Sequence, residues 1–136
     1  IGHHREKLDK ASWKHLKVRT NIQNLKNDAD IVVEATGSSR GLSDALSLCR
    51  PRGTIVLKST IADYDGMNLA PAVINEITII GSRCGQFEHA IRLLRAYPDM
   101  PLERLITAEY PPEQAADAFS KASSPSALKV VFNFKK

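Results

Sequence analysis

Short apolar runs rich in β-branched residues alternate along the chain with segments whose apolar residues recur every three or four positions. The run at 30–35 ends in a Thr-Gly-Ser-Ser sequence and predicts a buried strand followed by a loop. The apolar stripe at 42–49 predicts a helix, whose first turn Ser38 or Ser39 can cap. A Pro and a Gly end that helix, and 54–57 predicts the next strand. These elements make a βαβ unit.

The same alternation continues to the end of the chain, although segment 61–76 is less regular. Because a βαβ crossover is almost always right-handed and joins parallel strands, this order predicts an α/β fold: a Rossmann-like, doubly wound parallel sheet in three α/β/α layers. Such sheets bind ligands at the carboxyl ends of their strands. Further strands are expected at 77–81, 105–108 and 128–134. Further helices are expected at 6–16, at 87–94 and from 111 onwards. The inward face of the last helix is expected to consist of Ala115, Ala118, Phe119 and Ala122.

The composition is that of one ordinary globular domain, with 136 residues of which 43% are hydrophobic and 25% charged. No apolar run approaches the roughly 20 residues of a membrane span, and no signal region opens the chain, so we expect no membrane and a cytoplasmic location. The net charge of +4 comes from scattered basic residues, which argues against nucleic acid and would suit an anionic cofactor. Cys49 and Cys84 are expected to be reduced, partly buried thiols.

Four short stretches, in this order and at this spacing, resemble the medium-chain dehydrogenase/reductase family of zinc-type alcohol, polyol and threonine dehydrogenases. They are Arg5-Glu6-Lys7-Leu8, Val33-Glu34-Ala35-Thr36-Gly37, Arg50-Pro51-Arg52-Gly53-Thr54-Ile55-Val56 and Ile79-Ile80-Gly81-Ser82. The resemblance covers essentially all of 1–136 and implies a single, truncated NAD(P)-binding domain. It also implies that the first βα unit, with its glycine-rich pyrophosphate turn, and the catalytic GroES-like domain are absent.

The zinc of this family is therefore expected only in the absent catalytic domain. The four histidines, His15 among them, and the two cysteines lack the spacing of a three-ligand zinc site. We expect neither a metal ligand nor a catalytic residue in this chain.

By the resemblance, the chain starts at the end of the domain's second strand, where NAD-dependent relatives carry an acidic residue that binds the adenosine ribose. That position is Gly2 here, followed by His3, His4 and Arg5. Glycine leaves room for a 2′-phosphate and arginine can form charge-assisted bonds to it, so these residues are expected to bind the cofactor and to favour NADP over NAD. The alternative is a chain end whose histidines have no role.

The resemblance places the remaining cofactor contacts in the loops that follow the strands. Thr36 and Gly37 end a buried strand where glycine would let the adenosine or ribose approach closely, although a plain turn explains Gly37 nearly as well. The next two loops would contact the nicotinamide mainly through backbone atoms, and a lysine would lie near the pyrophosphate unless it only protects a strand edge. These residues are Lys58, Ser59 and Thr60 after 54–57, Ser82, Arg83 and Cys84 after 77–81, and Lys129 in the last strand.

The resemblance implies the cofactor-binding portion of an oxidoreductase that transfers a hydride between an alcohol or polyol and NAD(P), with zinc polarising the alcohol oxygen in the other domain. Alone, the chain is expected to be inactive. The alternative is a non-catalytic module that dimerises or binds a nucleotide weakly. Family members pair through an edge strand that 69–80 resembles, so a homodimer or tetramer is expected.

Overall fold

The structure is a computed structural model that describes residues 1–14, 16–61 and 66–134, so His15 and the final two lysines lie outside the described residues. Two compact units make up the chain. The β1–β3 unit comprises residues 22–86, and the β4–β5 unit comprises residues 1–21 and 87–136. Each is described by itself below, and one nucleotide-binding domain over the whole chain stays a prediction.

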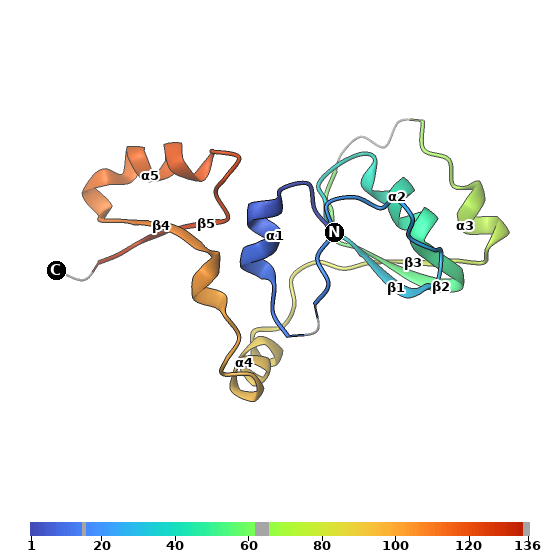
Figure 1. Ribbon diagram of the computed structural model, residues 1–136, viewed down its shortest axis with the longest axis horizontal. Helices are drawn as coiled ribbons and strands as arrows, with labels where there is room; N and C mark the ends of the chain where they lie inside the picture. The colour runs from blue at the N-terminus through green and yellow to red at the C-terminus, as the bar shows by residue number, and fades with distance from the viewer. Residues whose placement is uncertain (15, 62–65, 135–136) are drawn as a thin grey trace. The chain divides into compact units, whose positions relative to one another are not determined.

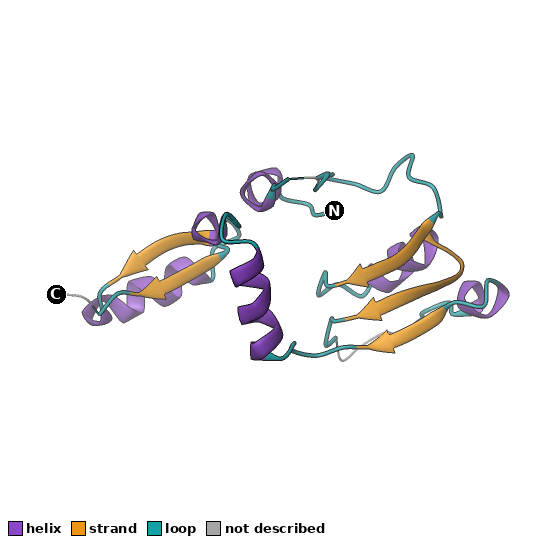
Figure 2. Ribbon diagram, turned by 90° about the horizontal axis from the view of Figure 1, so that it is seen from below, coloured by secondary structure: helices purple, strands orange, loops and turns teal. Residues whose placement is uncertain are grey.

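Three parallel strands form the sheet of the β1–β3 unit. They are β1 (Ala29–Glu34), β2 (Cys49–Leu57) and β3 (Thr78–Gly81), hydrogen-bonded in the order β1-β2-β3. Helix α2 (Gly41–Leu48) connects β1 to β2, and the short helix α3 (Ala70–Ile74) precedes β3. The arrowheads in Figure 2 show that the carboxyl ends of the three strands lie along one edge of the sheet. Parallel strands joined through helices confirm the predicted α/β class.

The core of this unit lies between α2 and one face of the sheet, as Figure 1 shows. Leu42, Ala45 and Leu46, three members of the predicted stripe, are at most 5% exposed. They pack against Cys49 and Ile55, of which Ile55 is fully buried at the centre of β2. Burying a side chain of this size stabilises a fold by about 1.5–3 kcal/mol.

The two-residue repeat of a strand decides which side chains of β1 meet this core. Val32 lies opposite Ile55 in the parallel register and packs against the core cluster. Glu34, two residues later, falls on the same face and is only 2% exposed. Ile31 and Val33 point to the other face and are 64% and 58% exposed. A carboxylate is thus buried where β1 ends, at the edge where parallel sheets bind ligands.

A second parallel pair forms the β4–β5 unit: β4 (Ile106–Tyr110) and β5 (Lys129–Phe132), with α5 (Ala115–Ala122) between them in the chain. Helix α5 packs along this pair (Figure 1) and buries Ala118 to 3% exposure. The predicted inward position of Phe119 is wrong, because this side chain is 68% exposed and meets Phe132 only edge to face. Two strands offer too narrow a face to cover every apolar position of a helix.

The remaining helices are short. They are α1 (Arg5–Ala11), α4 (Phe87–Ala96) and the 3₁₀ turns η1 (Leu102–Leu105) and η2 (Pro112–Gln114). The predicted helix over 6–16 therefore ends early, whereas those at 87 and near 111 are present, the latter opening as a 3₁₀ turn with proline in its first positions. Among the helices of the described residues, none is long and apolar enough to cross a membrane.

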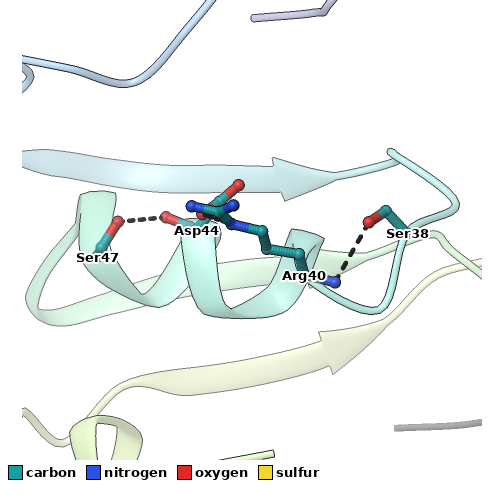
Figure 3. Close-up of polar contacts among 4 residues, drawn as sticks. All are labelled: Ser38, Arg40, Asp44 and Ser47. Carbon is teal, nitrogen blue, oxygen red and sulfur yellow. Dashed lines mark hydrogen bonds and ion pairs between the residues drawn. The ribbon is translucent and has the colours of Figure 1, made fainter.

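Two local predictions near α2 are corrected. Cys49 is not the last position of the helical stripe but the first residue of β2, where it stays 1% exposed. Neither Ser38 nor Ser39 caps the helix, since the N-cap is Arg40 and its side chain makes no capping hydrogen bond. Instead the Ser38 hydroxyl accepts a hydrogen bond from the Arg40 amide at 3.3 Å, so it shapes the loop before the helix (Figure 3). The exposed Arg40 also forms an ion pair with the half-buried Asp44 at 3.6 Å.

Candidate functional site at the strand ends

The loop after β1 is organised by the buried carboxylate of Glu34. Its Oε1 accepts two hydrogen bonds from Thr36, one from the amide and one from the hydroxyl, both 2.7 Å long. Gly37 follows in the left-handed region with φ of 67°, and no atom lies within 4 Å of where a Cβ would stand. Glycine is favoured by that backbone angle and leaves the turn open to close approach by a ligand.

Two hydrogen bonds tie this loop to the loop that follows β2. The Lys58 amide donates to the Glu34 carbonyl oxygen at 2.8 Å, and the Gly37 amide donates to the Ser59 hydroxyl at 2.9 Å. The second bond joins residues 22 positions apart in the chain. The parallel sheet brings these loops together, because β1 and β2 end side by side.

The side chain of Lys58 connects the β2 loop to the loop after β3. Its ammonium group donates to the Ser82 hydroxyl at 3.3 Å and to the Arg83 carbonyl oxygen. The Ser82 amide also donates to the Leu57 carbonyl oxygen at 2.9 Å, which continues the sheet pairing by one residue. All three loops are thus joined in one hydrogen-bonded edge, which we call the strand-end edge and which consists of Thr36, Gly37, Lys58, Ser59, Ser82 and Arg83.

The electrostatics of this edge combine one buried negative charge with exposed positive ones. Burial would raise the pKa of Glu34, but the hydrogen bonds from Thr36 and the nearby hydroxyl and amide of Ser59 together outweigh it, so the pKa lies below its ordinary value. Glu34 is therefore ionised at neutral pH. Lys58 and Arg83 are exposed, and an anionic ligand would benefit from both charges.

Glu34 is a candidate-site residue that the sequence prediction missed, although it lies within the Val33-Glu34-Ala35-Thr36-Gly37 stretch. Its Oε2 is buried and has no hydrogen-bond partner among the described residues. The signal was an acid that closes an otherwise apolar strand directly before Thr-Gly, because strand periodicity places it on the core face. A buried carboxylate is costly unless neighbouring donors stabilise it.

The predicted cofactor residues fall into two groups. The six residues of the strand-end edge are brought together by hydrogen bonds. Thr60 and Cys84 belong to the same loops; Cys84 is exposed, which corrects its predicted partial burial. The others belong to the β4–β5 unit: Gly2, His3, His4, Arg5 and Lys129.

Arg5, Gly2 and Lys129 are placed by local structure within the β4–β5 unit. The Arg5 guanidinium pairs with Asp9 at 3.0 Å within α1, with both side chains more than half exposed. The Gly2 amide donates to the Arg19 carbonyl oxygen at 3.0 Å. Lys129 is the first residue of β5 and lies opposite Ile106 of β4.

Two shallow depressions of about 490 and 440 Å³ are lined by residues of the range 94–109, and neither includes a residue of the strand-end edge. We favour the strand-end edge as the candidate site, because parallel α/β sheets bind ligands where their strands end. In the described part of the chain, no three His, Cys, Asp or Glu side chains come together to hold a metal ion.

The fold and this edge define a parallel α/β class of protein, and comparison with known proteins identifies the family. Residues 14–134 match the family model described as "Glucose dehydrogenase C-terminus", so the chain belongs to that family. Sorbitol dehydrogenase of Mus musculus is 28% identical over 109 residues, which cover 79% of this chain and 30% of that protein. The resemblance to zinc-type alcohol and polyol dehydrogenases is confirmed.

Solved structures confirm the Rossmann-like fold. L-idonate 5-dehydrogenase of Escherichia coli str. K-12 substr. MG1655 superposes with a TM-score of 0.72 at 24% identity, over 88% of this chain and 35% of that one. The short chain alcohol dehydrogenase of E. coli CFT073, complexed with cofactor NADH, superposes with a TM-score of 0.65 at 24% identity, over 77% of this chain and 32% of that one. The chain thus spans about a third of the length of these relatives.

Proposed function

We propose that the strand-end edge binds a nicotinamide dinucleotide and that the intact protein is an oxidoreductase acting on an alcohol or polyol. The observation that carries this proposal is the hydrogen-bonded edge that joins the loops after β1, β2 and β3, with Gly37 open to solvent. Membership of a dehydrogenase family and the polyol named for the mouse relative support the reaction class.

A bound dinucleotide would supply the hydride acceptor or donor, and this chain would bind and orient it. Thr36 and Gly37 would present backbone groups and an open surface to the adenosine half. Lys58 and Arg83 contribute positive charge that favours an anionic ligand, and the backbone of Ser59 and Ser82 lies in the loops proposed to meet the nicotinamide. We assign no zinc to the chain and propose that it is inactive by itself.

The choice between NADP and NAD rests on the start of the chain. We propose that Arg5 binds a 2′-phosphate and favours NADP, because Gly2 carries no side chain to repel it. The Arg5–Asp9 pair does not oppose this: such an exposed helix pair contributes only about 0.3–0.5 kcal/mol, so a phosphate can replace it.

Calorimetric titration of the 136-residue chain with NADPH and then NADH tests the proposal. We expect a dissociation constant below about 1 mM for at least one dinucleotide, and absence of binding by both would refute it. Lys58→Ala should weaken the binding of both, whereas Lys26→Ala, an exposed lysine of the same unit, should not.

A second titration tests the cofactor preference. Arg5→Ala should abolish the preference for NADPH. Asp9→Ala is the matched control, since it breaks the same ion pair but keeps the guanidinium and should retain the preference. Equal preference in the wild type and in Arg5→Ala would refute the role of Arg5.

The second candidate function is a non-catalytic module that self-associates. It is favoured by β3, which lies at the edge of the described sheet with all four residues exposed. An unpaired edge with Ile79 and Ile80 is a template for pairing with another strand. We propose a homodimer or tetramer formed at this edge; sedimentation velocity should then show Ile80→Lys shifting the chain to monomer.

A further inference from the structure

The least explained feature of the strand-end edge is the uneven bonding of the Glu34 carboxylate. Oε1 accepts two hydrogen bonds from Thr36, while Oε2 is buried without a partner among the described residues. The hydroxyl and amide of Ser59 face the same carboxylate and help to keep it ionised, without completing a hydrogen bond to Oε2. A buried polar atom left unpaired is rare in folded proteins and calls for a reason.

The geometry around Gly41 shows how tightly the carboxylate is held in place. A Cβ on Gly41 would stand 2.4 Å from Glu34 Oε1 and 2.2 Å from the Thr36 hydroxyl oxygen. The first residue of α2 therefore lies directly against the bonded pair, and the partial positive charge of the helix start favours a carboxylate there.

The bonds from this carboxylate lead outward to the open glycine. Thr36 donates to Glu34 and its hydroxyl accepts from the Ser38 amide at 3.1 Å, which fixes the turn on both sides of Gly37. Gly37 in turn donates to Ser59 of the next loop. The charge of one buried side chain thus orients donors in two loops that come from different strands.

We infer that Glu34 is a positioning residue for dinucleotide binding: it orients the Thr36–Gly37 turn and holds that turn against Ser59, so that the open face of Gly37 is preformed. This inference rests on the proposed function, and it names the residue on which the binding edge depends. Glu34 is buried and does not touch the ligand itself. Because Glu34 keeps the two loops ordered in the free protein, the entropic cost of ordering them is not added when the ligand binds.

The first test measures the loops without any ligand. In the ¹⁵N-labelled 136-residue chain, Glu34→Gln should speed hydrogen exchange of the Gly37 amide by about tenfold or more, because the glutamine side chain carries no charge to hold the turn. Thr36→Val should do the same, since it keeps the shape but removes the hydroxyl, and Thr36→Ser should retain slow exchange. Unchanged Gly37 exchange in both Glu34→Gln and Thr36→Val would overturn the inference.

The second test measures affinity at neutral pH under conditions where circular dichroism shows each variant fully folded. Titration with NADH and NADPH should show weaker binding by about tenfold in Glu34→Gln and Thr36→Val, and a smaller loss in Thr36→Ser, which keeps the hydroxyl. The double variant Glu34→Gln/Thr36→Val should bind no more weakly than either single variant, because both act through one turn.

The outcomes separate the two proposals. If the wild type binds neither dinucleotide, the proposed function fails, and Gly37 exchange still decides whether Glu34 couples the loops. If the wild type binds and Glu34→Gln binds equally well, the proposed function stands and the positioning role is refuted. Additive losses in the double variant would also refute it, since they would mean that Glu34 and Thr36 act separately.

Discussion

Replacing Gly41 by alanine should destabilise the β1–β3 unit. The added Cβ would stand 2.2 Å from the Thr36 hydroxyl oxygen and 2.4 Å from Glu34 Oε1, far inside normal contact. Neither oxygen can withdraw freely, because the two are hydrogen-bonded to each other at 2.7 Å and Glu34 is buried. Overpacking costs about 1–3 kcal/mol, and a weakened bond to a charged group costs about 1.5–3 kcal/mol.

Alanine has better helix propensity than glycine by about 1 kcal/mol, which offsets part of this cost. The net expected loss is therefore about 1.5–5 kcal/mol of unfolding free energy. The loss of unfolding free energy is measured by urea denaturation, with hydrogen exchange at the buried Ile55 as the probe, because Ile55 lies in the β1–β3 unit. Trp13 fluorescence would not report on this unit, because Trp13 belongs to the β4–β5 unit.

Ser43→Ala is the matched control, since Ser43 is exposed on the same helix and should gain a few tenths of a kcal/mol at most. Adding Thr36→Ala to Gly41→Ala removes one of the two clashing atoms. The double variant should therefore lose less unfolding free energy than the sum of the two single losses. A Gly41→Ala chain as stable as the wild type would refute the packing of α2 against the carboxylate.

Three further predictions follow from burial and charge. Ile55→Ala should cost about 2–5 kcal/mol and Ile55→Val about 0.5–1.5 kcal/mol in urea denaturation, because Ile55 is fully buried; equal stabilities would contradict the assigned core. At pH 8 a thiol reagent should modify exposed Cys84 quickly and Cys49 only on unfolding, since burial raises the pKa of the Cys49 thiol; mass spectrometry of digested protein distinguishes the two, and similar rates would show that Cys49 is accessible. Because the pKa of Glu34 is lowered in the folded state, the ionised carboxylate stabilises the fold fully above about pH 4.5, and this stabilisation is lost as the pH falls through the folded pKa. The unfolding free energy of Glu34→Gln should therefore fall less steeply with acid than that of the wild type. Identical pH profiles would refute the lowered pKa.

The proposed function gives this chain a supporting role. Under that proposal it would contribute orientation and electrostatics around the dinucleotide, and the cofactor would supply the hydride chemistry. The positive charges of Lys58 and Arg83 fit that supporting role.

Sequence periodicity determined the class of fold and the order of its elements. The stripe that begins at Leu42 correctly predicted the buried face of α2, and the run at 30–35 correctly predicted a strand that pairs in parallel. That strand, β1, lies at the edge of the described sheet and buries only one of its faces, so the prediction of a fully buried strand is wrong. Both signals are local, because the repeat of a helix or a strand fixes which side chains share a face. The positions of the loops after β1, β2 and β3 followed from the same pattern.

The tertiary structure decided what the pattern could not. Residues 49–53 contain Pro and Gly and look like a turn, yet they extend β2, because Cys49 pairs with Ala29 across a register shift and Arg52 adopts a positive φ of 60°. The exposure of Phe119 depended on how narrow its sheet is. Above all, the bond from Gly37 to Ser59 and the burial of Glu34 arise only when two strand ends lie side by side. The sequence by itself determined which loops form the edge, and long-range pairing decided which of their atoms meet.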